Sequence, residues 1–225
     1  MSSNPTPLEC AAASVIVPEI SQSHTVPKLY LLFHNIGKKC NIGLMLRSAA
    51  AFGVTEVITA GSRFSSFGSK GADRYVPIRE FDRLIDATSY LREKGVKIVG
   101  IEITDDALNV GTRPFTGSTC FFPGNEGEGL IEMQKAQCDS FVKIRQCGNG
   151  TASLNVSTAT AIVLHNFVEW AGFKEKERET ERDKYVVTPR DFSAMSDVAL
   201  DKRAQRQKNN TEVEVEGFSD HEIDS

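Results

Sequence analysis

The chain has 225 residues, of which 40% are hydrophobic and 25% are charged, and its formal net charge is −4. A chain of this length and composition can form one well-packed domain with about 50 to 80 residues to spare. No apolar run reaches the ~18 residues that a membrane-spanning helix needs, and residues 1–13 lack the basic and apolar regions of a secretory signal. We therefore expect an intracellular protein without a membrane span.

The negative charge is concentrated at the end of the chain. Residues 209–225 contain six acidic residues and no Lys or Arg. Without them the chain has 26 basic and 24 acidic residues, a net charge of +2. The composition of residues 209–225 predicts an acidic disordered tail. An RNA partner would have to bind a local basic patch on the nearly neutral remainder.

The cysteines and histidines do not form a recognisable metal-binding pattern. The four histidines lie far apart, without HExxH spacing, and the five cysteines include no CxxC pair. We therefore expect no metal site and reduced thiols. Reduced thiols fit the cytoplasm or the nucleus and do not exclude an organelle. The cysteines are Cys10, Cys40, Cys120, Cys138 and Cys147.

From Lys28 onward, short apolar runs alternate with segments of helical periodicity. This alternation predicts an α/β domain with a mostly parallel sheet flanked by helices on both faces. The expected strands are 29–33, 54–60, 97–103, 118–122 and 141–144, and the expected helices are 41–52, 80–94 and 154–170. The expected divisions of the chain are a flexible N-terminal arm at 1–27, the domain at 28–172, a charged extension at 173–208 and the tail at 209–225.

The first motif lies where the first strand passes into a helix and contains Asn41 and Arg47. Asn41 is a good candidate for the helix N-cap. Arg47 interrupts a helix made otherwise of Ile, Leu, Met and Ala, and an arginine on a largely buried helix needs an anionic partner. The alternative is an arginine whose charged end reaches solvent.

The second motif is the glycine-rich turn at residues 121–130, directly after an apolar strand. Glycine at Gly124 permits close approach of the backbone to a ligand. The turn lacks the GK[ST] ending and the GxGxxG spacing of phosphate-binding loops, and Glu126 and Glu128 would repel phosphate. It therefore favours an adenosine or amino-acid moiety, with an ordinary tight turn as the alternative.

The third motif, residues 144–157, runs from the strand end at Ile144 through a polar loop into the last helix. Ser153 and Asn155 are expected on the first helical turn, facing a pocket where free backbone N–H groups favour a negative group. The alternative is that Ser153 only caps the helix. All three motifs lie where a strand passes into a helix, which is where open α/β sheets bind ligands.

These motifs resemble the SpoU (TrmH-type) branch of the SPOUT methyltransferases. The family pattern runs N-x5-R-x-A-x-A-F-G, then G-N-E-G-x-G, then I-P-x-x-G followed by S-L-N-V-S, and all three parts occur here in order between Asn41 and Ser157. The resemblance covers residues 28–172. It implies a C-terminal trefoil knot, a homodimer, the cofactor S-adenosyl-L-methionine, and methylation of a ribose 2′-hydroxyl in tRNA or rRNA.

The resemblance also implies roles for individual residues. Arg47 matches the catalytic arginine of the family. Because arginine is effectively always protonated, we expect it to lower the hydroxyl pKa or to gather a phosphate that accepts the proton. The residues expected to complete the catalytic site are Asn41, Glu126, Ser153 and Asn155. Those expected to bind the cofactor are Gly124, Ile144, Leu154, Glu102 and Ile103.

The sequence departs from the family pattern at three places. Arg145 and Gln146 replace the usual proline and apolar residue, in a loop one residue longer than is common. Pro123 stands where an apolar residue is common, and residues 169–171 lack the arginines often found in members that act on tRNA.

Two other functions compete with methyl transfer. The alternative function is a catalytically silent module of the same fold that binds RNA for assembly or recruits a partner. The absence of GxGxxG after the first strand argues against a nucleotide-dependent dehydrogenase.

Overall fold

The computed structural model describes residues 26–61, 74–178 and 185. Most of the N-terminal arm, nearly all of the expected loop at 61–71, most of the charged extension and the whole acidic tail lie outside these residues. Within the described residues, no helix is both long enough and apolar enough to cross a membrane.

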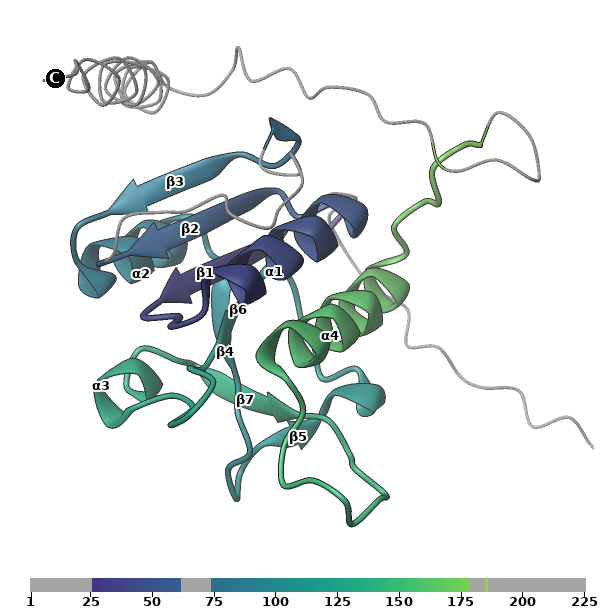
Figure 1. Ribbon diagram of the computed structural model, residues 1–225. Coiled ribbons are helices and arrows are strands. Elements are labelled where there is room, and N and C mark those ends of the chain that lie inside the picture. Colours follow the sequence, from purple (N-terminus) through teal and green to yellow (C-terminus); the bar gives the residue numbers. More distant parts are fainter. Residues whose placement is uncertain (1–25, 62–73, 179–184, 186–225) are drawn as a thin grey trace, which may run out of the picture.

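Seven strands form one sheet in the order β3-β2-β1-β6-β4-β7-β5, and every neighbouring pair is parallel. The sheet runs through the centre of the domain (Figure 1). Parallel strands buried on both faces are apolar along their whole length, which explains the continuous hydrophobic runs in the sequence. The strands are β1 Leu29–His34, β2 Glu56–Ala60, β3 Ile78–Phe81, β4 Lys97–Ile101, β5 Leu108–Asn109, β6 Thr119–Pro123 and β7 Ser140–Lys143.

Helices cover both faces of the sheet, as expected for this class (Figure 1). Helices α1 and α4 pack against each other and bury Met45 and Phe167 in one core, while α2 buries Leu91 in the core of the other face. The prediction of a mostly parallel sheet flanked by helices is confirmed. The helices are α1 Lys39–Ala51, α2 Leu84–Glu93, α3 Glu132–Lys135 and α4 Val156–Ala171, with a 3-10 turn at Val110–Thr112.

Two predictions about helix starts are wrong. The helix expected from Glu80 begins at Leu84, because Ile78–Phe81 forms β3 and pairs with β2. Strand pairing with a neighbour in space overrides the helical preference of Arg79 and Glu80. Helix α1 begins at Lys39, so Asn41 lies inside its first turn and is not the N-cap.

An aromatic cluster anchors the end of α4 to the sheet. The ring of Phe167 contacts Phe115, Phe121, Trp170 and Phe173, with ring centroids 5.2 to 6.2 Å apart. The backbone N–H of Phe173 also donates to the carbonyl of Val168. These contacts pack Phe173, which follows the end of α4, against the helix.

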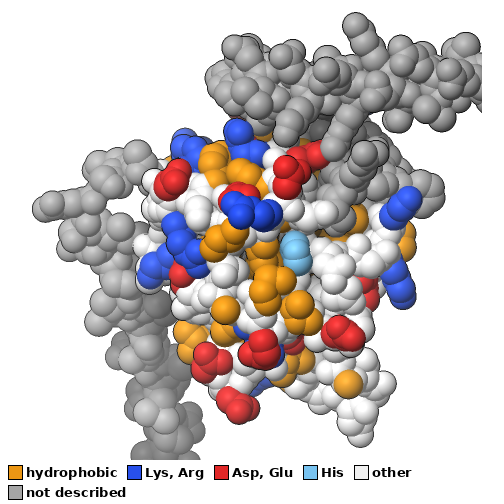
Figure 2. Space-filling view, turned by 90° about the vertical axis from the view of Figure 1, so that its left-hand side faces the viewer, with side chains coloured by type: hydrophobic (Ala, Val, Ile, Leu, Met, Phe, Trp, Pro, Cys, Tyr) orange, Lys and Arg blue, Asp and Glu red, His pale blue; other side chains and the backbone are white. Residues whose placement is uncertain are grey.

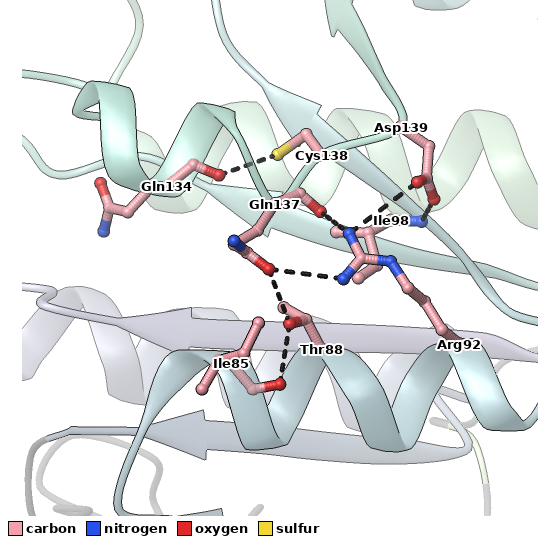
Figure 3. A network of polar contacts seen from close by, with 8 residues as sticks. All are labelled: Ile85, Thr88, Arg92, Ile98, Gln134, Gln137, Cys138 and Asp139. Atoms are coloured by element: carbon pink, nitrogen blue, oxygen red, sulfur yellow. Dashed lines mark hydrogen bonds and ion pairs between the residues drawn. The ribbon is translucent and has the colours of Figure 1, made fainter.

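A polar network joins α2 to the segment that leads into β7 (Figure 3). Arg92 donates to the backbone carbonyl of Gln137 at 2.8 Å, and Thr88 donates to the Gln137 side chain at 2.9 Å. Asp139 accepts from the backbone N–H of Ile98 in β4 at 2.7 Å. These contacts fix the start of β7 beside β4, so that the strand ends at the pocket described below.

Figure 2 looks onto the side of the molecule where α2 and α3 lie, and it shows an apolar stripe between charged side chains. The exposed large apolar residues on α2 and at α3 are Ile85, Ile131 and Met133. None of these three residues lines the pocket.

Candidate functional site

A pocket of about 290 Å³ opens at the carboxyl ends of β4, β6 and β7. It brings together three separate segments of the chain: the residues that follow β4, the second motif and the third motif. All five residues expected to bind the cofactor line it. Its walls are Ile101, Glu102, Ile103, Pro123, Gly124, Asn125, Glu126, Gly127, Glu128, Gly129, Val142, Lys143, Ile144, Gln146, Ser153, Leu154, Val156 and Ala159.

The loop of the second motif, residues 124–130, folds tightly back on itself. A Cβ atom at Gly124 would lie 2.6 Å from the carbonyl carbon of Gly129 and 2.7 Å from the nitrogen of Leu130, so only glycine fits there. The backbones of Asn125 and Gly129 exchange two hydrogen bonds of 2.9 and 3.1 Å. The Asn125 side chain also donates to the carbonyl of Asn35 at 2.8 Å, which ties the loop to the end of β1.

Glu102 holds the far end of the same loop. Its Oε2 accepts the backbone N–H of Leu130 at 2.6 Å, and its Oε1 accepts the N–H of Ile103 at 3.0 Å. Gly129 has φ +68°, and a Cβ there would collide with the Glu102 carboxylate. The residue after β4 is therefore both a wall of the pocket and a support for its glycine-rich loop.

Glu126 connects this loop to the first motif. Its carboxylate accepts from Asn41 Nδ2 at 2.7 Å and from the backbone N–H groups of Gly37 and Lys38 at 3.1 Å each. Burial alone would raise the pKa of Glu126, but these hydrogen bonds outweigh it and hold the pKa below its ordinary value of 4.5. Glu126 is therefore ionised at neutral pH, and its charge is used to position α1.

Asn155 links the first and third motifs. Its Nδ2 donates a hydrogen bond of 3.3 Å to the side-chain oxygen of Asn41. Because Asn41 in turn donates to Glu126, the three side chains form a continuous hydrogen-bonded chain. The Asn155 side-chain oxygen caps α4 by accepting from the backbone N–H and the hydroxyl of Ser157, at 2.9 and 2.6 Å.

The expected position of Ser153 and Asn155 on the first helical turn is wrong. Helix α4 begins at Val156, and its N-cap is Asn155. The alternative in which Ser153 caps the helix is wrong as well. Ser153 lies before the helix, is exposed and lines the pocket.

Arg47 is the one expected catalytic residue that neither lines the pocket nor belongs to the hydrogen-bonded chain of Glu126, Asn41 and Asn155. Its side chain is exposed, it does not line the pocket, and it forms no ion pair with a described residue. The prediction that burial forces an anionic partner on Arg47 is wrong. The apolar composition of the helix is misleading because only one face of α1 is buried, and Leu44 is 49% exposed.

The pocket combines acidic groups with apolar walls. Glu102, Glu126 and Glu128 line it together with a single lysine, Lys143, whose ammonium donates to the carbonyl of Thr104 at 3.2 Å. Such a lining favours a cationic ligand that also carries a flat apolar part. Among the described residues, no group of three or more His, Cys, Asp or Glu side chains could hold a metal ion.

Lys143 and Asn125 are not among the site residues that the sequence motifs predict. Lys143 is the last residue of β7, and the end of a parallel strand in an open α/β sheet is a place where ligand-contacting residues occur. That rule could have identified it. Asn125 lies inside the second motif, but its partner, the carbonyl of Asn35, is 90 residues away, and no local signal predicts this contact.

Comparison with known proteins gives consistent matches. The profile of the SpoU rRNA Methylase family matches residues 28–165. The tRNA (guanosine(18)-2′-O)-methyltransferase of Escherichia coli is 29% identical over 143 residues, which are 62% of each chain. The 23S rRNA (guanosine-2′-O-)-methyltransferase RlmB of Vibrio vulnificus is 32% identical over 158 residues, which are 67% of this chain and 62% of that protein. This chain thus spans less than two thirds of these relatives.

Solved structures match the same region. The SpoU methyltransferase AviRb from Streptomyces viridochromogenes, in complex with the cofactor AdoMet, aligns with a TM-score of 0.59 and 25% identity, over 65% of this chain and 61% of that chain. An RNA methyltransferase of the TrmH family from Porphyromonas gingivalis aligns with a TM-score of 0.56 and 25% identity, over 66% and 62% of the two chains.

Proposed function

Because the chain belongs to the SpoU rRNA Methylase family, we propose that it transfers a methyl group from S-adenosyl-L-methionine to a ribose 2′-hydroxyl of tRNA or rRNA. The observation that carries the proposal is the pocket itself. Two separate motifs meet there, with three carboxylates and aliphatic walls that suit a ligand carrying a sulfonium cation and an adenine base.

Two groups of residues, one lining the pocket and one at its polar edge, would have different roles. Gly124, Ile144, Leu154, Glu102 and Ile103 would bind the cofactor, which supplies a methyl group on a sulfonium. Asn41, Glu126, Ser153 and Asn155 would form the polar edge of the site toward the RNA. Three of these four are already connected by hydrogen bonds, so the edge is preorganised.

Arg47 would act on the ribose hydroxyl, which is a weak nucleophile. A guanidinium keeps its proton at neutral pH, so Arg47 would lower the pKa of the hydroxyl or hold a neighbouring phosphate as the proton acceptor. Either role contributes on the order of 10²–10⁴-fold, as is typical of general acid–base catalysis.

The position of Arg47 supports a homodimer as the active form. Arg47 and Leu44 lie three residues apart on the exposed face of α1, and Leu44 leaves half of its apolar surface accessible. A dimer formed across this face would cover Leu44 and give Arg47 access to a pocket that it does not reach in its own chain.

We also propose that the C-terminal part of the domain forms the trefoil knot of the family. Two features support this. Strand β7 comes late in the chain yet pairs with β4 and β5, so it lies between two earlier strands. The chain then passes through the pocket loop and returns in α4, which packs against α1.

The test is methyl transfer from labelled S-adenosylmethionine to tRNA and rRNA from cells that lack the protein, followed by mapping of ribose methylation. Arg47→Ala should lose at least a hundredfold in turnover, with unchanged folding and unchanged affinity for S-adenosylhomocysteine. Arg47→Lys should fail as well, because an ammonium cannot reproduce the planar donor fork.

The alternative, a catalytically silent module that binds RNA, predicts cofactor or RNA binding without transfer. A wild-type protein that binds S-adenosylhomocysteine but methylates neither RNA class would favour that alternative. Wild-type turnover in a folded Arg47→Ala protein would leave methyl transfer in place and reject the role of Arg47.

A further inference from the structure

The polar side chains of the pocket differ in whether they already form hydrogen bonds within the protein. Most of them hold a backbone or side-chain group of the protein in place, and these are Glu102, Asn125, Glu126 and Lys143. Gln146 is half-buried in the same pocket and forms no hydrogen bond with a described residue. Its carboxamide therefore has one acceptor and two donors available for a ligand.

Two other polar side chains of the pocket also lack a side-chain partner among the described residues, but their surroundings differ. Glu128 and the hydroxyl of Ser153 are exposed, so water can satisfy them at no cost. A half-buried carboxamide can form fewer hydrogen bonds with water, and a polar group without a partner costs free energy when it is desolvated. Gln146 is therefore the neutral polar group of the pocket that gains most from pairing with a ligand.

Gln146 lies on the wall of the pocket that is formed by the end of β7 and the loop after it. It lies two residues after Ile144, in the loop whose other pocket residues include Leu154. The carboxylates lie on the residues after β4 and on the loop 124–130. A ligand with a cation at one end and a flat base at the other would direct the cation toward the carboxylates and the base toward the aliphatic side chains.

We propose that the Gln146 carboxamide recognises the adenine base of the cofactor by pairing with its 6-amino group and an adjacent ring nitrogen. The inference rests on the proposed function, because it names how the S-adenosylmethionine pocket selects its ligand. Adenine presents a donor beside an acceptor, and a carboxamide matches that pair with two hydrogen bonds. The apolar residue usual at this position could pack against the base but could not read its amino group.

The experiment measures the affinity of the full chain for two ligands by calorimetry. One ligand is S-adenosylhomocysteine, and the other is the same compound without the 6-amino group. Each is titrated into the wild type, into Gln146→Met, which keeps the side-chain length without donor or acceptor, and into the control Arg145→Met. Arg145 is exposed and does not line the pocket.

Gln146→Met should bind S-adenosylhomocysteine about tenfold more weakly than the wild type. The two proteins should bind the ligand that lacks the 6-amino group with affinities within about threefold of each other. Arg145→Met should behave as the wild type with both ligands. Thermal unfolding should be unchanged in both variants, because neither side chain has a partner in the described chain.

Two results would overturn this inference and leave the proposed function intact. Equal affinity of wild type and Gln146→Met for S-adenosylhomocysteine would show that the carboxamide is not used. An equal loss for both ligands would show that Gln146 shapes the loop and does not read the amino group. If the folded wild type binds neither ligand at millimolar concentration, the proposed function fails and this inference fails with it.

Discussion

Residues 124–130 and residues 145–153 contribute walls to the same pocket and differ in how the rest of the chain holds them. In the first loop, the backbone N–H of Leu130 donates to Glu102 and the Asn125 side chain donates to the carbonyl of Asn35. Glu126 of the same loop accepts from Asn41 in α1. In the second loop, the one hydrogen bond donated by a backbone N–H to a described residue is from Ser153 to the Thr151 hydroxyl, at 3.4 Å.

We infer from this difference that the loop 124–130 is ordered without a ligand and that the loop 145–153 becomes ordered when a ligand binds. Four backbone N–H groups of the first loop, those of Asn125, Gly127, Gly129 and Leu130, are hydrogen-bonded within the protein before any ligand arrives. The loop can therefore present backbone atoms at fixed positions. The second loop is mostly exposed from Arg145 to Ser153 and has few internal bonds. We expect substitutions in the first loop to change the shape of the pocket, and substitutions in the second to act only through direct contact with a ligand.

A pair of glycine substitutions gives the largest expected contrast. Gly124→Ala places a Cβ 2.6 Å from backbone atoms and should destabilise the protein by about 1–3 kcal/mol and abolish measurable binding of S-adenosylhomocysteine. Gly150→Ala, in the second loop, meets nothing within 4 Å and should change neither property. Thermal unfolding and calorimetry on both variants check this. Equal behaviour of the two would mean that the first loop is no more rigid than the second.

The next contrast compares two carboxylates of the pocket. Glu102→Gln replaces an oxygen that accepts a partly buried backbone N–H by an amino group, which should cost about 2 kcal/mol of stability and about tenfold in ligand affinity. Glu128→Gln removes the same charge from an exposed residue that holds no described group. Chemical denaturation and ligand titration should separate the two. Equal losses of affinity would show that the charge matters and the support of the loop does not.

Glu126 should make the stability of the first loop depend on pH. Its pKa in the folded chain lies below its ordinary value of 4.5, so its contribution is complete above that value and is lost as the pH falls through the lower folded pKa. At pH 7, Glu126→Gln should be less stable by about 1 kcal/mol, because water can partly replace the exposed contacts to Gly37 and Lys38. The difference from the wild type should shrink as the pH falls below 4.5 and through the lowered pKa of Glu126 in the folded chain. A difference that stays constant from pH 7 to pH 3 would exclude a role for the carboxylate charge.

Much of this fold follows from local patterns, and the exceptions depend on distant partners. The strands β1 and β6 are predicted well because a buried parallel strand is largely apolar along its length. Strand β3 was missed because Arg79 is polar, and the ion pair that stabilises it is with Glu56, 23 residues earlier.

The same limit applies to the site. Motif positions place Gly124 and Leu154 in one pocket, but local rules assign Asn41 to a helix cap. Its actual partner, Glu126, is 85 residues away. Arg47 was misjudged because composition does not tell which face of a helix is buried.

The smallest expected effect is a change in backbone exchange without a change in stability. The N–H groups of Asn125, Gly127, Gly129 and Leu130 are already hydrogen-bonded, so S-adenosylhomocysteine should slow their hydrogen exchange only as far as it stabilises the whole domain. The N–H groups from Arg145 to Thr151 donate to no described residue, so their hydrogens should exchange quickly in the free protein. We expect the bound ligand to order this loop. Exchange followed by mass spectrometry with saturating ligand should therefore show additional protection in 145–153 and little in 124–130. The reverse pattern would mean that the ligand builds the glycine-rich loop and that the second loop is the preformed wall.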